Sequence, residues 1–161
     1  MADRARAHVN LVAERLLALL QEIGRTDLYK WLTTPRTIEM MTGPGDLKKA
    51  RPGIFLEVVE VVPDPGRGVM GPAVPELASF LVHCTAEDVN DPSGACHDLM
   101  ADVERKIREN RQLGQTNGVL KTGTIKTLKR KASIQASEGG SGLSVGFVEV
   151  EASYLTSSES P

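Results

Sequence analysis

The segment from Gly142 to Tyr154 constrains the fold of this chain more than any other part of its sequence. Its side chains alternate between two faces, of which one carries Leu143, Val145, Phe147, Glu149 and Glu151 and the other carries Val148, Val150 and Tyr154. A period of two in a segment rich in Val, Phe and Tyr is typical of a half-buried β-strand. A polar tail of residues 156–161 follows, so we expect the fold to close on a strand.

Upstream, the first element is an amphipathic helix from about Asp3 to Ile23. Its apolar residues recur at steps of three and four, which places on one helical face Val9, Val12, Leu16, Leu19, Leu20 and Ile23. Gly24 follows where a helix of this kind is expected to end. The connection from Arg25 to Gly53 is predicted to be extended, with one edge strand near residues 36–41.

A hairpin comes next. Ile54 to Val62 is a strong strand candidate, and Leu77 to Cys84 is its predicted return strand. Between them, the prolines and glycines of Pro63 to Pro75 are predicted to exclude regular structure. A loop of this length in a compact domain is often functional.

The second helix is predicted to begin at Pro92, with Asp91 as its N-cap, and to run to about Arg111 or Leu113. Its predicted buried stripe is Cys96, Leu99, Met100, Val103 and Ile107, with Leu113 as a candidate last member. The predicted solvated face is Asp98, Asp102, Glu104, Arg105, Lys106, Arg108 and Glu109.

A second hairpin completes the order. Val119 to Gln135 favours a strand with a bulge or kink at Gly123, and residues 137–142 form the turn into the last strand. We therefore predict an α/β (α+β) fold with an antiparallel sheet of about four strands and two main helices packed on one side. The order is helix, hairpin, helix, hairpin, in a single domain of residues 1–155.

Composition excludes several classes of function. The chain has 161 residues and a formal net charge of −2, which gives no global signature for nucleic acid or membrane binding. Its two cysteines, Cys84 and Cys96, are expected to be free thiols in a reducing cytoplasm. A metal site with the adjacent His83 and His97 is disfavoured, because neighbouring residues on a strand point to opposite faces.

The patterns that carry common catalytic chemistry are not found. The glycines from Gly139 to Gly142 lie between two β segments, whereas a dinucleotide site needs a helix after them. The strand carboxylates Glu57, Glu60, Glu149 and Glu151 are expected to be solvated rather than paired in a cleft. We therefore predict no catalytic, cofactor or metal site.

The densest positive charge lies on the Val119–Gln135 segment. Strict alternation predicts Lys121, Lys129 and Lys131 on one face and Lys126 and Arg130 on the other. One interpretation is protection of an exposed sheet edge. The other is contact with an acidic partner surface or passing DNA, and on that interpretation the candidate interface residues are Lys126, Lys129, Arg130 and Lys131, together with Arg67 in the glycine-rich loop.

The pattern of elements resembles the tail terminator proteins, also called tail-to-head joining or tail completion proteins, of long-tailed bacteriophages and related tailed particles. The resemblance rests on the N-terminal helix from Ala7 to Ile23, on Pro52-Gly53-Ile54-Phe55 at the start of the first long strand, and on the long-looped hairpin. It also rests on the helix from Asp91 to Leu113 and on the final strand, Phe147 to Tyr154, with its terminal aromatic residue.

The resemblance implies an antiparallel sheet with helices on one side and a hexameric ring that caps the tail tube. Such a ring stops tube polymerisation and contacts the head completion or neck protein, with passive contact to DNA in transit. The protein would be assembled in the host cytoplasm and lie at the tail–head junction of the virion, with no enzymatic activity and no membrane partner. Two alternatives remain: another head–tail connector or minor tail component, and a small ferredoxin-like ligand-binding or enzymatic domain.

Overall fold

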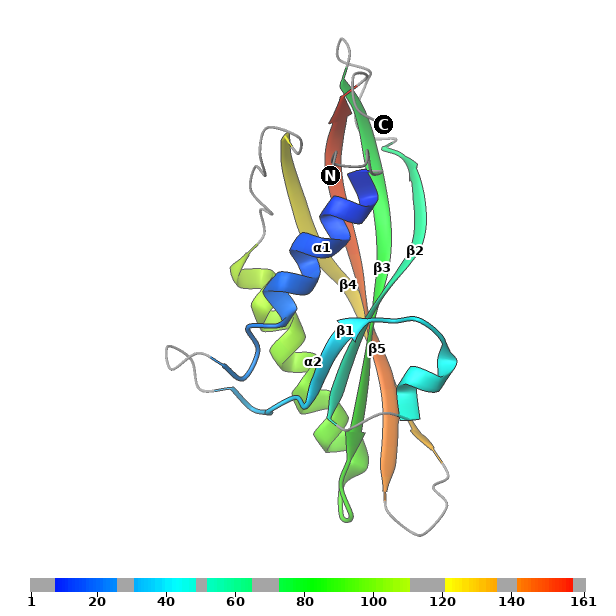
Figure 1. Cartoon of the computed structure of the whole chain (residues 1–161). Helices are drawn as coiled ribbons and strands as arrows, with labels where there is room; N and C mark the ends of the chain where they lie inside the picture. Colours follow the sequence, from blue (N-terminus) through cyan, green and yellow to red (C-terminus); the bar gives the residue numbers. More distant parts are fainter. Residues whose placement is uncertain are drawn as a thin grey trace, which may run out of the picture.

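A computed structural model describes residues 8–25, 31–48, 52–64, 73–110, 121–135 and 142–157 of the chain. In chain order its elements are α1 (His8–Leu20), β1 (Thr37–Met40), the short 3₁₀ helix η1 (Pro44–Lys48), β2 (Gly53–Pro63), β3 (Ala73–Glu87), α2 (Pro92–Glu109), β4 (Lys121–Gln135) and β5 (Leu143–Ser157). Figure 1 shows these elements as one twisted sheet with both helices beside it.

The strands form a single sheet in the order β1-β2-β3-β5-β4. The predicted α+β class is confirmed, and β2, β3, β5 and β4 are the antiparallel strands that the sequence predicts. The predicted edge strand is also present, but its pairing is parallel, so the sheet is mixed rather than antiparallel. The segment near residues 36–41 adds to the edge as β1, which pairs parallel to the first residues of β2.

Both helices pack on one face of the sheet, here called the covered face. Phe80 and Val82 of β3 and Val148 and Val150 of β5 lie there without exposed surface, in one core with α1 and α2. The two helices bring their own apolar stripes into this core, from α1 Val12, Leu16 and Leu20 and from α2 Cys96, Leu99, Met100, Val103 and Ile107. The predicted stripe of the second helix is therefore confirmed from Cys96 to Ile107, and Leu113 lies outside the described residues.

The opposite face, here called the open face, carries the alternate residues of the same strands. Phe147, Glu149 and Glu151 of β5 lie on it and are only partly buried. At one end the face is closed, because η1 contacts β2 and β3 and Phe55 is fully buried outside the main core. Over most of its length no described segment packs on it.

Local sequence signals explain where the helices start and stop. Gly24 follows α1 with φ of 80°, a left-handed conformation that glycine adopts without a Cβ penalty. Asp91 caps α2, since its Oδ1 accepts a hydrogen bond of 3.0 Å from the backbone N–H of Gly94, and Pro92 occupies the first turn. The predicted start of α2 is confirmed, whereas α1 ends at Leu20, before the predicted end at Ile23, and the chain continues in turns to Gly24. Neither described helix combines the length and the apolar character that crossing a bilayer requires.

The first hairpin is longer than predicted. β2 continues to Pro63, which pairs with Glu76, and β3 begins at Ala73, which pairs with β5, so part of the predicted loop is strand. Proline lacks a donor but keeps its carbonyl, and Pro75 accepts a hydrogen bond of 3.0 Å from the N–H of Asp64. The exclusion of regular structure from this whole segment was therefore wrong at its two ends.

Candidate functional site

The basic residues of β4 do not follow the predicted alternation. A register shift lies between Thr127, which pairs with Val150, and Lys129, which pairs with Glu149. The extra residue, Leu128, forms a bulge. Each residue after it therefore points to the face opposite to the one that strict alternation predicts. Lys126, Lys129 and Lys131 consequently share the open face, and Arg130 points to the covered face. The prediction that Lys126 and Lys129 lie on opposite faces was wrong.

Each of three basic residues has a carboxylate partner within the fold. Lys126 Nζ lies 3.4 Å from Glu151 Oε1, and Lys129 Nζ lies 3.6 Å from Glu149 Oε2. Arg130 reaches the other way, to Glu104 on α2 at 3.5 Å. The two lysine side chains remain 66% exposed, so these pairs are solvated and individually weak.

The acidic residues that the sequence places on strands lie on the open face in columns along the strands. Glu57 and Glu60 belong to β2, and Glu149 and Glu151 belong to β5. Glu57 Oε1 lies 3.0 Å from His83 Nε2. Between the charges lie Leu77, Leu81, Val145 and Phe147, all partly buried. The open face is therefore a mixed apolar and charged surface, with glutamates along β2 and β5 and lysines along β4.

A cavity of about 690 Å³ lies where the end of α2 meets β4 and β5. Its charged lining comes from Asp64, Glu104, Arg108, Lys126 and Glu151, and its apolar lining from Leu77, Ile107 and Ile125. Charges of both signs line it, and Lys126 and Glu151 already pair with each other. This lining is suited to a polar ligand or a protein side chain rather than to an apolar molecule.

The cysteines and histidines are not brought together. Cys84 lies on the covered face without exposed surface, whereas His83 beside it lies on the open face with Glu57. Cys96 packs against β3 with its Sγ 3.8 Å from the carbonyl oxygen of Cys84, and His97 next to it is exposed. Burial raises the pKa of both thiols, that of Cys84 well above its usual value. Within the described ranges no three His, Cys, Asp or Glu residues form a group that could hold a metal ion.

Two charged residues of α2 are buried, which contradicts their predicted place on the solvated face. Asp102 is 1% exposed and accepts hydrogen bonds from the backbone N–H groups of Leu32 and Thr33 and from Thr33 Oγ1, at 3.1, 2.9 and 2.6 Å. Lys106 is 6% exposed and pairs with Glu22. Arg105 stacks over Trp31 at 5.6 Å. These contacts hold the segment after α1 against α2, which is a structural role.

The sequence contained a signal for this role that the prediction missed. Leu99, Asp102 and Lys106 recur at steps of three and four, so both charged residues flank the apolar stripe rather than oppose it. Two other predicted features, Arg67 and the glycine cluster up to Ser141, lie outside the described residues.

Comparison with known proteins gives no relative from which a role could be transferred. No protein-family model matches the chain, and no curated protein matches it.

Proposed function

We propose that the protein is a structural component of a tailed virion that forms a ring on the end of the tail tube, stops tube polymerisation and offers a surface to the head completion or neck protein. It acts by binding and not by catalysis. The ring is hexameric, as the resemblance to tail terminator proteins implies, and is assembled in the host cytoplasm before it lies at the tail–head junction.

The observation that carries this proposal is the open face of the sheet. Helices cover one face, and the other presents apolar and charged side chains along strands of up to 15 residues. Extended surfaces of this mixed character are typical of contacts between proteins. The order of helices and hairpins on which the resemblance rests is also the order of the fold.

The distribution of charge favours protein partners over nucleic acid. Lys126 and Lys129 lie beside glutamates of β5, which reduces the positive potential that phosphate binding needs. Contact with DNA in transit is therefore passive on this proposal, and the lysines serve contacts with acidic protein surfaces.

The cavity at the end of α2 supports one alternative, a small ligand-binding domain. Its volume of about 690 Å³ lies within the range of ligand sites. A polar ligand bound there would contact Arg108 and Lys126. Ligand-dependent thermal stabilisation that is lost in Arg108→Ala would favour this alternative over the ring.

The test uses tail tubes of a particle whose tube protein gene neighbours the gene for this chain. Purified protein is added to polymerising tubes, and the products are imaged by negative-stain electron microscopy with a label on the added protein. The proposal expects label at one tube end, a six-fold ring there in end views, and arrested growth. Label along the whole tube, or tubes that grow as they do without the protein, would overturn it.

A further inference from the structure

Among the described strands, the sheet has two edges without a pairing partner, and both expose apolar residues. β4 forms one edge along its whole length. At the other edge β1 pairs only with Gly53–Leu56, so no described strand pairs with the outer side of β2 from Glu57 to Pro63. The most exposed apolar residues of the strands lie on these edges: Val59 and Val61 on β2, at 53% and 37%, and Leu128 on β4, at 46%. Unpaired edges of this kind are templates for another strand.

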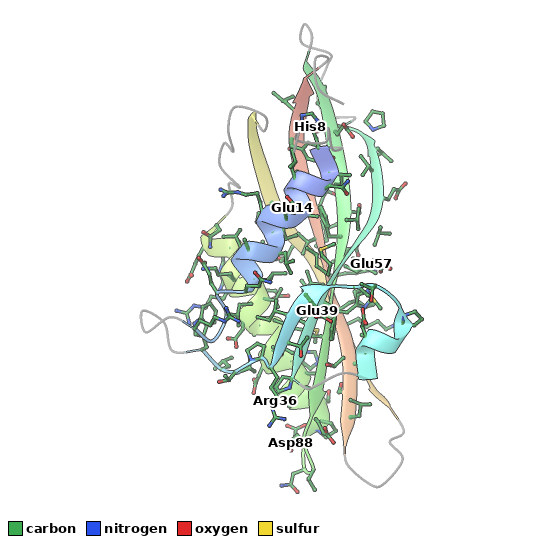
Figure 2. The ribbon with its side chains drawn as sticks, viewed as in Figure 1. His8, Glu14, Arg36, Glu39, Glu57 and Asp88 are labelled. Atoms are coloured by element: carbon green, nitrogen blue, oxygen red, sulfur yellow. The ribbon has the colours of Figure 1, made fainter. Side chains whose placement is uncertain are left out.

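The charges at the two edges are opposite, and they lie at matching levels. Glu60 pairs with Ser79, Ser79 with Glu151, and Glu151 with Lys126, so one row of open-face residues runs from an acid to a base. Two further rows of open-face residues also begin with a glutamate and end with a lysine. One runs from Glu57 to Lys129 and the other from Glu39 to Lys131. Figure 2 labels Glu39 on β1 and Glu57 on β2, two of the acidic ends.

We infer that the β4 edge of one copy of this chain joins the outer side of β2 of a second copy, head to tail, with Lys126 and Lys129 facing Glu60 and Glu57. This inference names the subunit contact of the ring proposed above and so rests on that function. Three antiparallel pairings separate β2 from β4, so the two strands run in opposite directions. A neighbouring copy turned about an axis along the strands therefore pairs them antiparallel.

The matching levels of the charges bear on whether this contact forms a ring or a filament. A head-to-tail contact closes into a ring when the copies are related by rotation alone, and gives an open helix when a translation is added. Because each glutamate lies in the same row as its lysine, the two edges meet without a shift along the strands. This register meets the condition for closure that the absence of such a translation sets.

A second copy fits these edges better than DNA or an unrelated protein. The β2 edge supplies carboxylates and the β4 edge supplies ammonium groups, and both edges carry exposed aliphatic residues and backbone groups that no described strand pairs. Glutamates outnumber lysines among the described open-face residues, which opposes phosphate binding. The solvated pairs of Lys126 and Lys129 with β5 hold both ammonium groups on the open face, where a lysine can bridge to a second carboxylate.

Charge reversal tests the contact. One variant carries Lys126→Glu and Lys129→Glu, and the other carries Glu57→Lys and Glu60→Lys. Each alone places like charges across the contact, and we expect self-association to weaken by about a hundredfold or more, as measured by sedimentation velocity and native mass spectrometry. Mixed in equal amounts, the two variants have complementary edges at every contact and should assemble as alternating rings.

Circular dichroism of each variant shows whether it is folded. The decisive measurement is whether the mixture of the two variants assembles. Recovery of assembly in the mixture supports the contact. Folded variants that assemble alone as the parent does, or a mixture that stays monomeric, would overturn it.

A crosslinking experiment tests the register and does not depend on the charge variants folding. Glu60→Cys and Lys126→Cys proteins are mixed and treated with a short bifunctional maleimide; the native Cys84 and Cys96 have no exposed surface. The expected product is a heterodimer that exceeds the product from Lys126→Cys mixed with Val89→Cys, a position that is 79% exposed outside both edges.

Equal yields in the two mixtures, or a parent that is monomeric at all concentrations, would overturn the inference. Rings that cap tubes but show no Glu60–Lys126 crosslink would leave the proposed function standing and reject only this contact. A specific crosslink without tube capping would reject the function and retain the contact.

Discussion

His83 and Cys84 are neighbours in the chain, yet they belong to two surfaces with different physical character. Cys84 lies on the covered face without contact with water, and burial holds the pKa of its thiol well above the usual value. His83 lies on the open face, where a half-exposed carboxylate, that of Glu57, lies 3.0 Å from its ring. The covered face fixes the fold, and the open face leaves side chains available to another surface.

Charged residues show the same contrast. On the covered side Asp102 is enclosed and holds the segment after α1 with three hydrogen bonds. On the open side Lys126 and Lys129 lie more than 3 Å from their partners and are largely exposed. A buried charge that loses its partners is strongly destabilising, whereas an exposed pair contributes little. Buried charge on the covered side is therefore structural, and exposed charge on the open side is free to serve assembly.

The largest expected difference between the faces is in aromatic packing. Phe80→Ala should lower the free energy of unfolding by about 3–5 kcal/mol, because it leaves a cavity in the enclosed core. Phe147→Ala, on the neighbouring strand and the open face, should cost roughly 1–2 kcal/mol, since that ring is only partly buried. Urea unfolding of both variants measures the difference. Equal losses would show that the open face is packed as firmly as the covered one.

The next effect concerns the buried carboxylate. Asp102→Ala leaves two backbone N–H groups and the Thr33 hydroxyl without their acceptor, and we expect a loss of roughly 2–4 kcal/mol. Asp98→Ala on the exposed side of the same helix is the matched control and should change stability by less than about 0.5 kcal/mol. If the two variants unfold at the same urea concentration, Asp102 does not hold the Leu32–Thr33 segment.

These two regions also differ in how far the sequence predicts them. The period of two in β5, the apolar stripe of α2 and its Asp91 cap are local patterns, and each is confirmed in the fold. The burial of Asp102 depends on a segment about 70 positions away in the chain, whose path no local pattern specifies. Its spacing from Leu99 shows only that it borders the buried stripe.

The candidate interface was predicted in composition but not in geometry. Its lysines and glutamates are readable in the sequence, whereas the bulge at Leu128 has no glycine or proline to mark it and reverses the faces beyond it. The parallel pairing of β1 with β2 is likewise set by tertiary contacts, because a short strand carries no signal for its direction. That Glu60 and Lys126 lie in one row across the sheet can be established only when the register of every strand pair between β2 and β4 is known.

The pH dependence of stability tests whether water is excluded from the two buried thiols on the covered face. Burial raises the folded pKa of Cys84 and Cys96, so both stay protonated while unfolded thiols ionise above about pH 8.5. Their contribution to stability is thus present below the unfolded pKa and is lost as the pH rises toward the folded values. We expect a loss of up to about 1.4 kcal/mol per pH unit per thiol above pH 8.5.

The measurement is urea unfolding between pH 8 and 9.5. Tyr154, whose phenol pKa is raised by burial and by Glu76, adds its own loss of stability only at higher pH, where the unfolded tyrosine ionises at about pH 10. The control is the Cys84→Ala, Cys96→Ala variant, which should have a flatter pH profile whatever its absolute stability. Parallel profiles for parent and variant would mean that the thiols ionise in the folded protein and that the covered face admits water.

The smallest expected effect on stability, and the most informative for the open face, comes from replacing Lys126, Lys129, Arg130 and Lys131 with Gln. Three solvated ion pairs are lost, and the free energy of unfolding should fall by roughly 1 kcal/mol or less at low salt and by less still at high salt. The same variant should lose most of its self-association and its recruitment to tubes.

Glu149→Gln with Glu151→Gln is the matched control, because it removes the partners within the sheet but keeps the lysines for a neighbouring copy. If the four-residue variant assembles like the parent across a range of salt, the basic residues of β4 only protect a sheet edge, and the open face would have to recruit its partners through apolar contacts alone.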